Sequence, residues 1–328
     1  MVAPKVSVLV VTYNQAPFIE QALNSILEQK TCFEFEVVIG DDCSTDGTGE
    51  IIQHFQQWYP EIIKPVFNAE NLGFLHNWKK TYERCLGEFL AILEGDDFWT
   101  DPLKLQKQVE FLDKNPDYGL VYTEYNRFYQ NKNKLVTSFC NKQWGLLPSG
   151  DVFHKLIYPQ DLLIQFLTTL IRKELIDKHY EFDVAVAHQW RTIDVGLWIV
   201  IAKHSKVKYF NQPMATYRVL ESSISNNKDR FSRYMFHQSV FDIYNYYANK
   251  YHQPNEIKNK IRYHHLRVLL NDAFFLKKKN LATKCKMELS QFGYKFSLNQ
   301  RFKYYATRCK SLNSLALYLS KIINQLKK

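Results

Sequence analysis

Short apolar runs that alternate with amphipathic segments restrict the first 125 residues to an α/β fold. The runs at residues 6–11, 35–39 and 89–93 are rich in β-branched and aromatic side chains and have strand length. Apolar residues at helical spacing follow each run, and we predict helices at about 17–27, 46–59, 75–85 and 102–114. This alternation predicts a mostly parallel sheet with helices on both faces.

Polar residues follow each predicted strand, where ligands of parallel sheets bind. They comprise an aromatic side chain and several carboxylates: Thr12, Tyr13 and Asn14 after the first strand, Asp41 and Asp42 after the second, and Glu94, Asp96 and Asp97 after the third. We expect these side chains to line one crevice.

The acidic turn at Glu94, Asp96 and Asp97 is a candidate metal site. Neighbouring carboxylates repel one another unless a cation neutralises them. Mn²⁺ and Mg²⁺ favour oxygen ligands and bind through one or two protein carboxylates together with substrate phosphates. An acidic turn is also a common structural feature after a strand, so the turn alone does not decide between these readings.

A second acidic turn spans residues 40–48. Capping of the next helix accounts for Ser44, Thr45 or Asp46. It does not require Asp41 and Asp42, which could accept hydrogen bonds from a base or a ribose. Tyr13 could stack on that base, or it could serve in ordinary packing.

Four segments in this order resemble family 2 of the glycosyltransferases, which have the GT-A fold, a Rossmann-like α/β architecture. They are Val8 to Asn14, Asp41 to Thr48, Asn71-Leu72-Gly73, and Glu94 to Asp97. The resemblance covers about residues 5–225. It implies that the nucleoside of a nucleotide-sugar donor is held by Thr12, Tyr13, Asn14, Asp41, Asp42, Asn71 and Gly73.

The resemblance also implies a Mn²⁺ or Mg²⁺ ion. Asp96 and Asp97 would contact ribose and metal. Glu94 stands where the family more often has Asp, which leaves open whether it contacts the metal directly.

Asp194 resembles the family's general base, because it precedes Trp198 by four residues in an Asp-x-x-Leu-Trp pattern. A helix N-cap is the alternative reading of the same residue. Further along, Tyr217-Arg218 resembles the end of the catalytic domain, but Leu220 replaces a His found in many relatives. Arg218 could face the diphosphate, or it could be an ordinary structural Arg.

The activity implied is transfer of a hexose with inversion, in which a metal assists the leaving group. UDP-sugars are the expected donors. A glycan or a polyprenyl-linked glycan is the expected acceptor, as in the synthesis of bacterial cell-surface polysaccharide, lipopolysaccharide or capsule. Another sugar-nucleotide enzyme, such as a nucleotidyltransferase or epimerase, is the alternative, although no Gly-x-Gly-x-x-Gly or P-loop opens the first helix.

The net charge of +10 is concentrated in the last third of the chain. Residues 220–328 hold 21 Lys and Arg against 6 Asp and Glu. We predict a catalytic domain at 1–225 and a helical, basic region at 226–328. Its last residues, from Arg301, alternate basic with aromatic and apolar side chains, which is typical of docking on an anionic membrane.

Packing onto the catalytic domain, or onto a second copy in a homodimer, is the other reading of these helices. We expect no nucleic-acid partner. A contrasting hypothesis makes the chain an inactive transferase-like domain whose tail docks on membrane or RNA.

The six cysteines are scattered and lack zinc spacing. Neither a signal peptide nor a run of roughly 18 apolar residues is evident. We therefore expect reduced thiols and a cytoplasmic location, with the inner face of the cell membrane as a docking surface.

Overall fold

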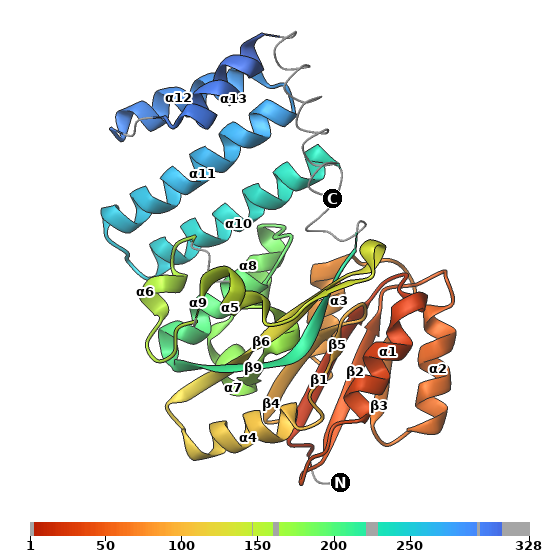
Figure 1. Cartoon of the computed structure of the whole chain (residues 1–328). Helices are drawn as coiled ribbons and strands as arrows, with labels where there is room; N and C mark the ends of the chain where they lie inside the picture. The colour runs from red at the N-terminus through yellow and green to blue at the C-terminus, as the bar shows by residue number, and fades with distance from the viewer. Residues whose placement is uncertain (1–2, 146, 160–163, 221–228, 294–295, 310–328) are drawn as a thin grey trace. The chain divides into compact units, whose positions relative to one another are not determined.

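A computed structural model describes residues 3–145, 147–159, 164–220, 229–293 and 296–309. The chain divides into two compact units (Figure 1). The catalytic unit comprises residues 1–156 and 160–220, and the helical unit comprises 157–159 and 221–328. The predicted boundary between residues 225 and 226 lies outside the described residues and stays a prediction.

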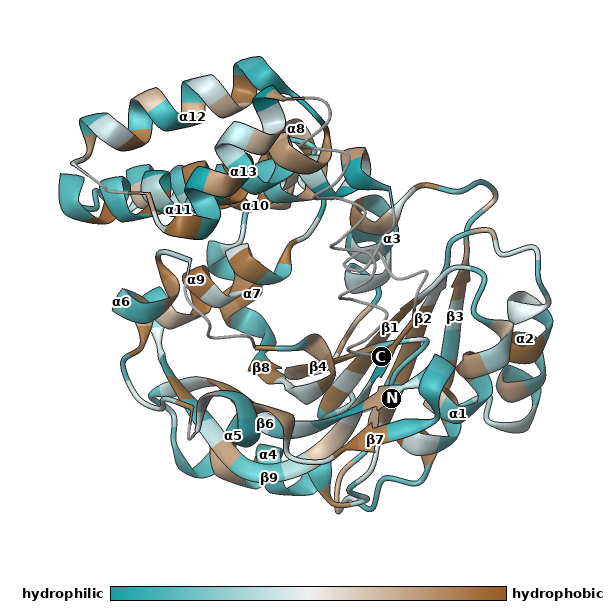
Figure 2. Cartoon of the chain, turned by 45° about the horizontal axis from the view of Figure 1, so that its top comes forward, coloured by the Kyte–Doolittle hydropathy of each residue, from teal (hydrophilic) through white to brown (hydrophobic). Residues whose placement is uncertain are grey.

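Four parallel strands form the first half of the sheet in the catalytic unit, in the order β3-β2-β1-β4. Their bounds are β1 Val6–Thr12, β2 Phe35–Asp41, β3 Ile63–Phe67 and β4 Phe89–Glu94. All residues of β1 are buried, and Figure 2 shows the hydrophobic character of β1 and β4 in brown. This part of the sheet agrees with the alternation in the sequence.

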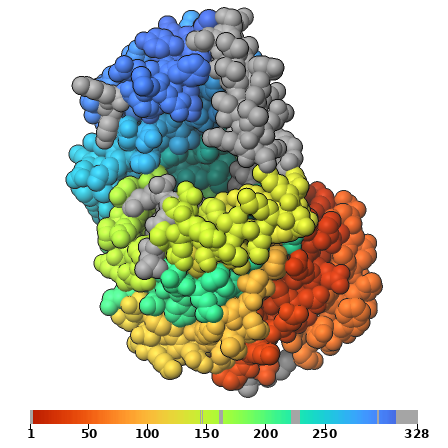
Figure 3. Space-filling model, viewed as in Figure 1, coloured from red at the N-terminus to blue at the C-terminus, as the bar shows by residue number. Residues whose placement is uncertain are grey.

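Helices cover both faces of this half, as predicted. Side chains of α1 (Ala16–Leu27), α2 (Thr48–Trp58) and α4 (Lys104–Lys114) share one apolar core with the strands. In contrast, α3 (Phe74–Tyr82) packs on β1 and β2, and its Asn77 and Thr81 lie against Gly40 of β2. The first helix–strand pairs form a contiguous red and orange surface (Figure 3).

The second half of the sheet is mixed rather than mostly parallel. Its order is β8-β6-β9-β5, with β7 paired to β6; only β6 and β9 are parallel, and the other pairs, including β4 with β8, are antiparallel. The strands are β5 Phe98–Trp99, β6 Tyr118–Tyr129, β7 Lys134–Val136, β8 Leu170–Arg172 and β9 Lys206–Val219. The α/β class is confirmed.

Short helices connect these strands. They are η1 Gln130–Lys132, α5 Phe139–Trp144, α6 Phe153–Leu156, η2 Phe166–Thr168, α7 Lys173–His179, α8 Phe182–Ala187 and α9 Asp194–His204. Of these, α9 is the most buried, and α7 packs against it.

Strand β3 was not predicted from the sequence. It is an edge strand that pairs only with β2 among the described strands, and it contains Pro65 and the exposed Lys64. Pro and Lys protect strand edges from pairing with other chains, and they also break the apolar pattern that reveals a strand.

The helical unit consists of amphipathic helices around its own core. They are α10 Arg230–Lys250, α11 Asn255–Phe275, α12 Lys279–Gln291 and α13 Leu298–Arg308. The core joins α11, α12 and α13 through Leu270, Cys285 and Tyr304, among others. No helix in the described residues is long and apolar enough to cross a membrane.

Candidate active site

The carboxyl ends of β1, β2 and β4 bring three predicted segments together at one edge of the sheet. Thr12 pairs in register with Asp41, and Val11 with Glu94. Parallel pairing therefore brings the ends of these strands, and the polar residues that follow them, to the same edge of the sheet.

The turn after β1 is fastened to the turn after β2. Asn14 has a left-handed conformation, with φ of 53°, and its side-chain oxygen accepts a hydrogen bond from the N–H of Thr45 at 2.8 Å. The N–H of Asn14 donates to Ser44 Oγ at 2.9 Å. Tyr13, which lies between these contacts and Thr12, is 48% exposed, so its ring is available for a ligand.

Asp46 connects the starts of two helices. Its carboxylate accepts hydrogen bonds from the N–H groups of Ala16, at the start of α1, and Thr48, at the start of α2. The N-cap residue of α2 is Gly47 with φ of 96°, not Asp46 itself. Burial raises the pKa of Asp46, but the hydrogen bonds from Thr48 and Ala16 outweigh it and lower that pKa below its usual value.

Asp41 and Asp42 are both buried but hold different loops. Asp41 accepts from the hydroxyl and the N–H of Ser44, at 2.5 and 3.2 Å. Asp42 accepts from the N–H groups of Leu72 and Gly73, each at 2.8 Å, so both of its oxygens are engaged by the loop that leads into α3.

The predicted residues Asn71 and Gly73 belong to this loop. The side-chain amide of Asn71 donates to the backbone oxygen of Asp42 at 3.3 Å, and Gly73 has φ of 78° at the N-cap of α3. The structure thus joins Asp42, Asn71 and Gly73 through hydrogen bonds between the end of β2 and the loop before α3.

The acidic turn after β4 contains one buried carboxylate, that of Asp97, whereas Glu94 and Asp96 are partly exposed. Asp97 is 1% exposed; its Oδ1 accepts from the N–H of Arg218 at 2.7 Å, whereas its Oδ2 is buried without a hydrogen-bond partner. Burial and the charges of Asp96 and Glu94 raise the pKa of Asp97 well above its usual value. Burial, followed by the charges of Asp96 and Asp194, raises the pKa of Glu94 to about 8.

The turn after β4 requires a glycine at position 95, because side chains from the turn after β1 lie very close to its backbone. A Cβ there would lie 2.4 Å from Gln15 Oε1 and 2.9 Å from Thr12 Oγ1. The turn after β4 therefore packs directly on the turn after β1.

These carboxylates fit a divalent cation that also takes ligands from its substrate. Across the described ranges, no three His, Cys, Asp or Glu side chains are arranged as a complete metal site. Mg²⁺ and Mn²⁺ are held by one or two carboxylates plus phosphate oxygens. The unpaired Oδ2 of Asp97 is a suitable ligand, with Asp96 adjacent to it.

Asp194 is the first residue of α9, and its charge contributes to the raised pKa of Glu94. Its Oδ1 accepts from the Thr192 hydroxyl at 2.6 Å and from the N–H of Val195 at 2.7 Å. No donor in the described part of the chain reaches Oδ2. The N-cap residue of α9 is Ile193, so Asp194 occupies the first helical position rather than the cap.

Two residues near Asp194 were not identified from the sequence. Thr192 holds one oxygen of Asp194, and a Thr two positions before an Asp is too common to be noticed. Tyr180 is buried; its hydroxyl lacks a hydrogen-bond partner, and burial and the charge of Asp194 raise its pKa. Nothing in the sequence distinguishes Tyr180 from the other tyrosines.

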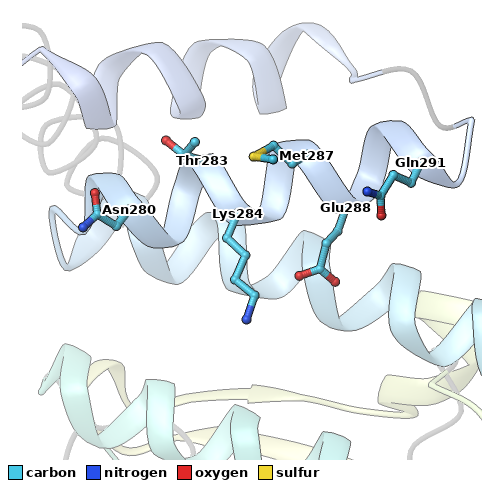
Figure 4. A pocket seen from close by; sticks show the side chains of 6 residues that line it. All are labelled: Asn280, Thr283, Lys284, Met287, Glu288 and Gln291. Atoms are coloured by element: carbon cyan, nitrogen blue, oxygen red, sulfur yellow. The ribbon is translucent and has the colours of Figure 1, made fainter.

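A cavity of about 390 Å³ lies elsewhere, along α12 of the helical unit (Figure 4). Its lining comes from a single helix: Asn280, Thr283, Lys284, Met287, Glu288 and Gln291. A shallow surface formed by one helix face lacks the convergent polar groups of an active site.

The fold matches solved structures of sugar-nucleotide-dependent transferases with the GT-A fold. TarS of S. aureus (residues 1–349), solved with UDP-GlcNAc, superposes with a TM-score of 0.54 and 18% identity over 92% of this chain and 79% of TarS. A mannosyltransferase of Pyrobaculum calidifontis, solved with GDP-Man and Mn²⁺, superposes with a TM-score of 0.52 and 19% identity over 97% of this chain and 82% of that protein. At these identities the likeness shows the fold.

A family model described as glycosyl transferase family 2 matches residues 7–179. The Bacillus subtilis protein TuaG, which carries the name of a teichuronic acid biosynthesis glycosyltransferase, is 30% identical over 69% of this chain and 83% of its own length. The chain belongs to glycosyl transferase family 2, as the motifs predicted.

Two further relatives differ in how much they share. An uncharacterised protein of Mycobacterium tuberculosis is 40% identical over 128 residues, which cover 39% of this chain and only 37% of that protein. The Escherichia coli enzyme WfgD, named a UDP-Glc:α-D-GlcNAc-diphosphoundecaprenol β-1,3-glucosyltransferase, is 27% identical over 68% of this chain and 80% of its own length.

Proposed function

We propose that this protein is an inverting glycosyltransferase that moves a hexose from a nucleotide-sugar, most simply a UDP-sugar, to a hydroxyl of a glycan or lipid-linked glycan. Family membership supports sugar transfer. The names of WfgD and TuaG support UDP-linked donors and a role in cell-surface polysaccharide synthesis.

The orientation of Asp194 is the observation that carries this proposal. Two donors hold Oδ1, so Oδ2 is the oxygen that accepts a proton from the acceptor hydroxyl. As that hydroxyl loses its proton to Asp194, its oxygen attacks the anomeric carbon, and the bond from that carbon to the diphosphate breaks. General-base catalysis of this kind contributes about 10²–10⁴-fold to the rate.

The carboxylates after β4 would assist departure of the nucleoside diphosphate. Asp97, with Asp96 beside it, would hold Mn²⁺ or Mg²⁺, and Glu94 completes the acidic wall. When bound, the cation supplies positive charge that neutralises the departing diphosphate. Tyr13 would stack on the base, and Asp41 would accept a hydrogen bond from the nucleoside.

The test is release of nucleotide from a panel of UDP-, GDP- and dTDP-sugars with and without Mn²⁺. Asp194→Asn should retain donor affinity in calorimetry but lose turnover, because an amide cannot accept the proton. Asp97→Ala should lose metal-dependent donor binding. Asp183→Asn, an exposed residue of α8, is the matched control and should behave as wild type.

The result also separates the proposal from the inactive docking module. A pure protein that binds none of the donors and releases no nucleotide would refute the enzymatic function. Normal turnover in Asp194→Asn would leave the glycosyltransferase standing but assign the base elsewhere.

A further inference from the structure

Arg218 is a buried cation next to the acidic turn. It lies one residue before the end of β9 and is only 5% exposed. Its guanidinium carbon lies 4.8 Å from the ring centre of Phe18, 5.2 Å from that of Phe98 and 5.6 Å from that of Phe128. Such a site excludes water and strengthens the interactions of the charge.

Arg218 contacts both aspartates of the turn. Its backbone N–H donates to Asp97 Oδ1 at 2.7 Å, and its Nε donates to the backbone oxygen of Asp96 at 2.8 Å. The backbone at position 218 thus orients the side chain of Asp97, and the guanidinium holds the main chain of Asp96 and fixes the end of β9 beside the turn. These contacts leave Asp97 Oδ2 as the unpaired oxygen.

The rest of the guanidinium is occupied by neutral partners. Its terminal nitrogens donate to the side-chain oxygens of Gln130, in η1, and Gln21, in α1. A phosphate could bind the guanidinium only if these contacts were broken. Within the described ranges the group also has no direct carboxylate partner, so its charge acts on the acidic turn through space.

We infer that Arg218 is a positioning residue that presents Asp96 and Asp97 for metal-dependent binding of the donor diphosphate, without touching the diphosphate itself. The inference rests on the proposed function and adds a residue to it. The sequence left open whether Arg218 faces the diphosphate or is an ordinary structural Arg. The inference favours a structural Arg that positions the acidic turn.

The test measures the Mn²⁺ concentration that gives half-maximal UDP binding in calorimetry. Arg218→Lys keeps the charge but cannot reach Asp96 and both glutamines at once. We expect it to need about tenfold more Mn²⁺, the usual effect of removing a residue that orients a metal ligand. Gln21→Ala, which removes one anchor from the exposed face of α1, should shift the midpoint less in the same direction.

Arg172→Lys is the matched control. Arg172 also donates to backbone carbonyls, those of Tyr118 and Leu112, and lies over the ring of Phe89, at the opposite end of β4. It should lower thermal stability to a similar degree without changing the Mn²⁺ midpoint.

Three outcomes overturn the inference. An unchanged midpoint in Arg218→Lys excludes positioning, and if UDP affinity still falls at saturating Mn²⁺, the residue contacts the diphosphate. Equal shifts in Arg218→Lys and Arg172→Lys indicate general destabilisation. If wild type binds neither UDP, GDP nor dTDP with Mn²⁺, the proposed function itself fails, and the inference with it.

Discussion

Asp194 illustrates how much of the chemistry depends on single hydrogen bonds. Burial raises its pKa, and the donors Thr192 and Val195 oppose that rise. The Oδ1 atom of the carboxylate is therefore held by contacts that lie within two residues of it, and these contacts favour the charged form.

Thr192→Val should move the acidic limb of the pH–rate profile upward. The Thr192 hydroxyl stabilises the charged carboxylate, so its loss raises the pKa of Asp194 further. Turnover should fall more at pH 5 than at pH 8. Because a base must be deprotonated to act, the sign of the shift follows directly.

Thr81→Val is the control for this substitution. Thr81 is also buried, but its hydroxyl donates to the backbone oxygen of Asn77 in α3. A profile that shifts equally in both variants, or in neither, would contradict the role of Thr192.

At the scale of elements, neighbouring aspartates after β2 have separate tasks. The carboxylate of Asp42 holds the loop that precedes α3, whereas the carboxylate of Asp41 accepts from Ser44 in its own turn. Two residues that are indistinguishable in the sequence therefore support different elements: Asp41 is the last residue of β2, and Asp42 is the first residue of the following turn.

Asp42→Asn should lower the free energy of unfolding of the catalytic unit by about 2 kcal/mol, because an amide cannot accept from Leu72 and Gly73 with both of its atoms. Asp41→Asn should be more stable than Asp42→Asn but should bind UDP more weakly. Trp fluorescence in urea measures this unit selectively, since all 6 Trp precede residue 199. Equal stability of the two variants would contradict the division of tasks.

For the whole molecule, the two units should respond differently to acid. His265 is buried in the helical unit, where its ring stacks on Phe241 and bonds with Gln238. Burial, followed by the charge of Arg262, lowers its pKa to about 4. A histidine whose pKa is lower in the folded state than in the unfolded state destabilises the folded state as the pH falls below the unfolded-state pKa, which is near 6.5.

We therefore expect the helical unit to lose up to about 3 kcal/mol between pH 6.5 and 4 through this residue. His265→Gln should remove that part of the pH dependence, whereas His252→Asn, at an exposed position, should not. Hydrogen exchange of peptides from α11, compared with wild type at equal pH, reports on this unit alone. Parallel pH responses of wild type and His265→Gln would refute the prediction.

Membrane docking by the basic tail stays a prediction, and most of that tail, residues 310–328, lies outside the described residues. Its described beginning, α13, contributes Tyr304 to the core of the helical unit. A truncation that tests docking should therefore end at Cys309 and keep α13 intact. We expect the full chain, but not this truncation, to co-sediment with anionic liposomes at low salt and to be released by high salt. A full chain that stays in the supernatant would end the hypothesis.

Local patterns in the sequence determined three of the four strands in the parallel half of the sheet, the helices that follow them, the acidic turns and the family. Apolar period and turn composition depend on residues only a few positions apart, so they can be read without a structure. The mixed half of the sheet and the edge strand β3 could not be read in this way, because strand direction there is set by pairing between distant segments.

Only the tertiary structure decided which atoms of the predicted site are free. Asp42 is engaged by residues about thirty positions away, and Arg218 binds Gln21 across 197 positions. Such long-range contacts produce no periodic pattern of residue types in the sequence. The sequence thus indicated which carboxylates follow the strands, whereas the long-range contact with Arg218 decided that Oδ2 is the oxygen of Asp97 without a donor among the described residues, because Oδ1 is held by the fold.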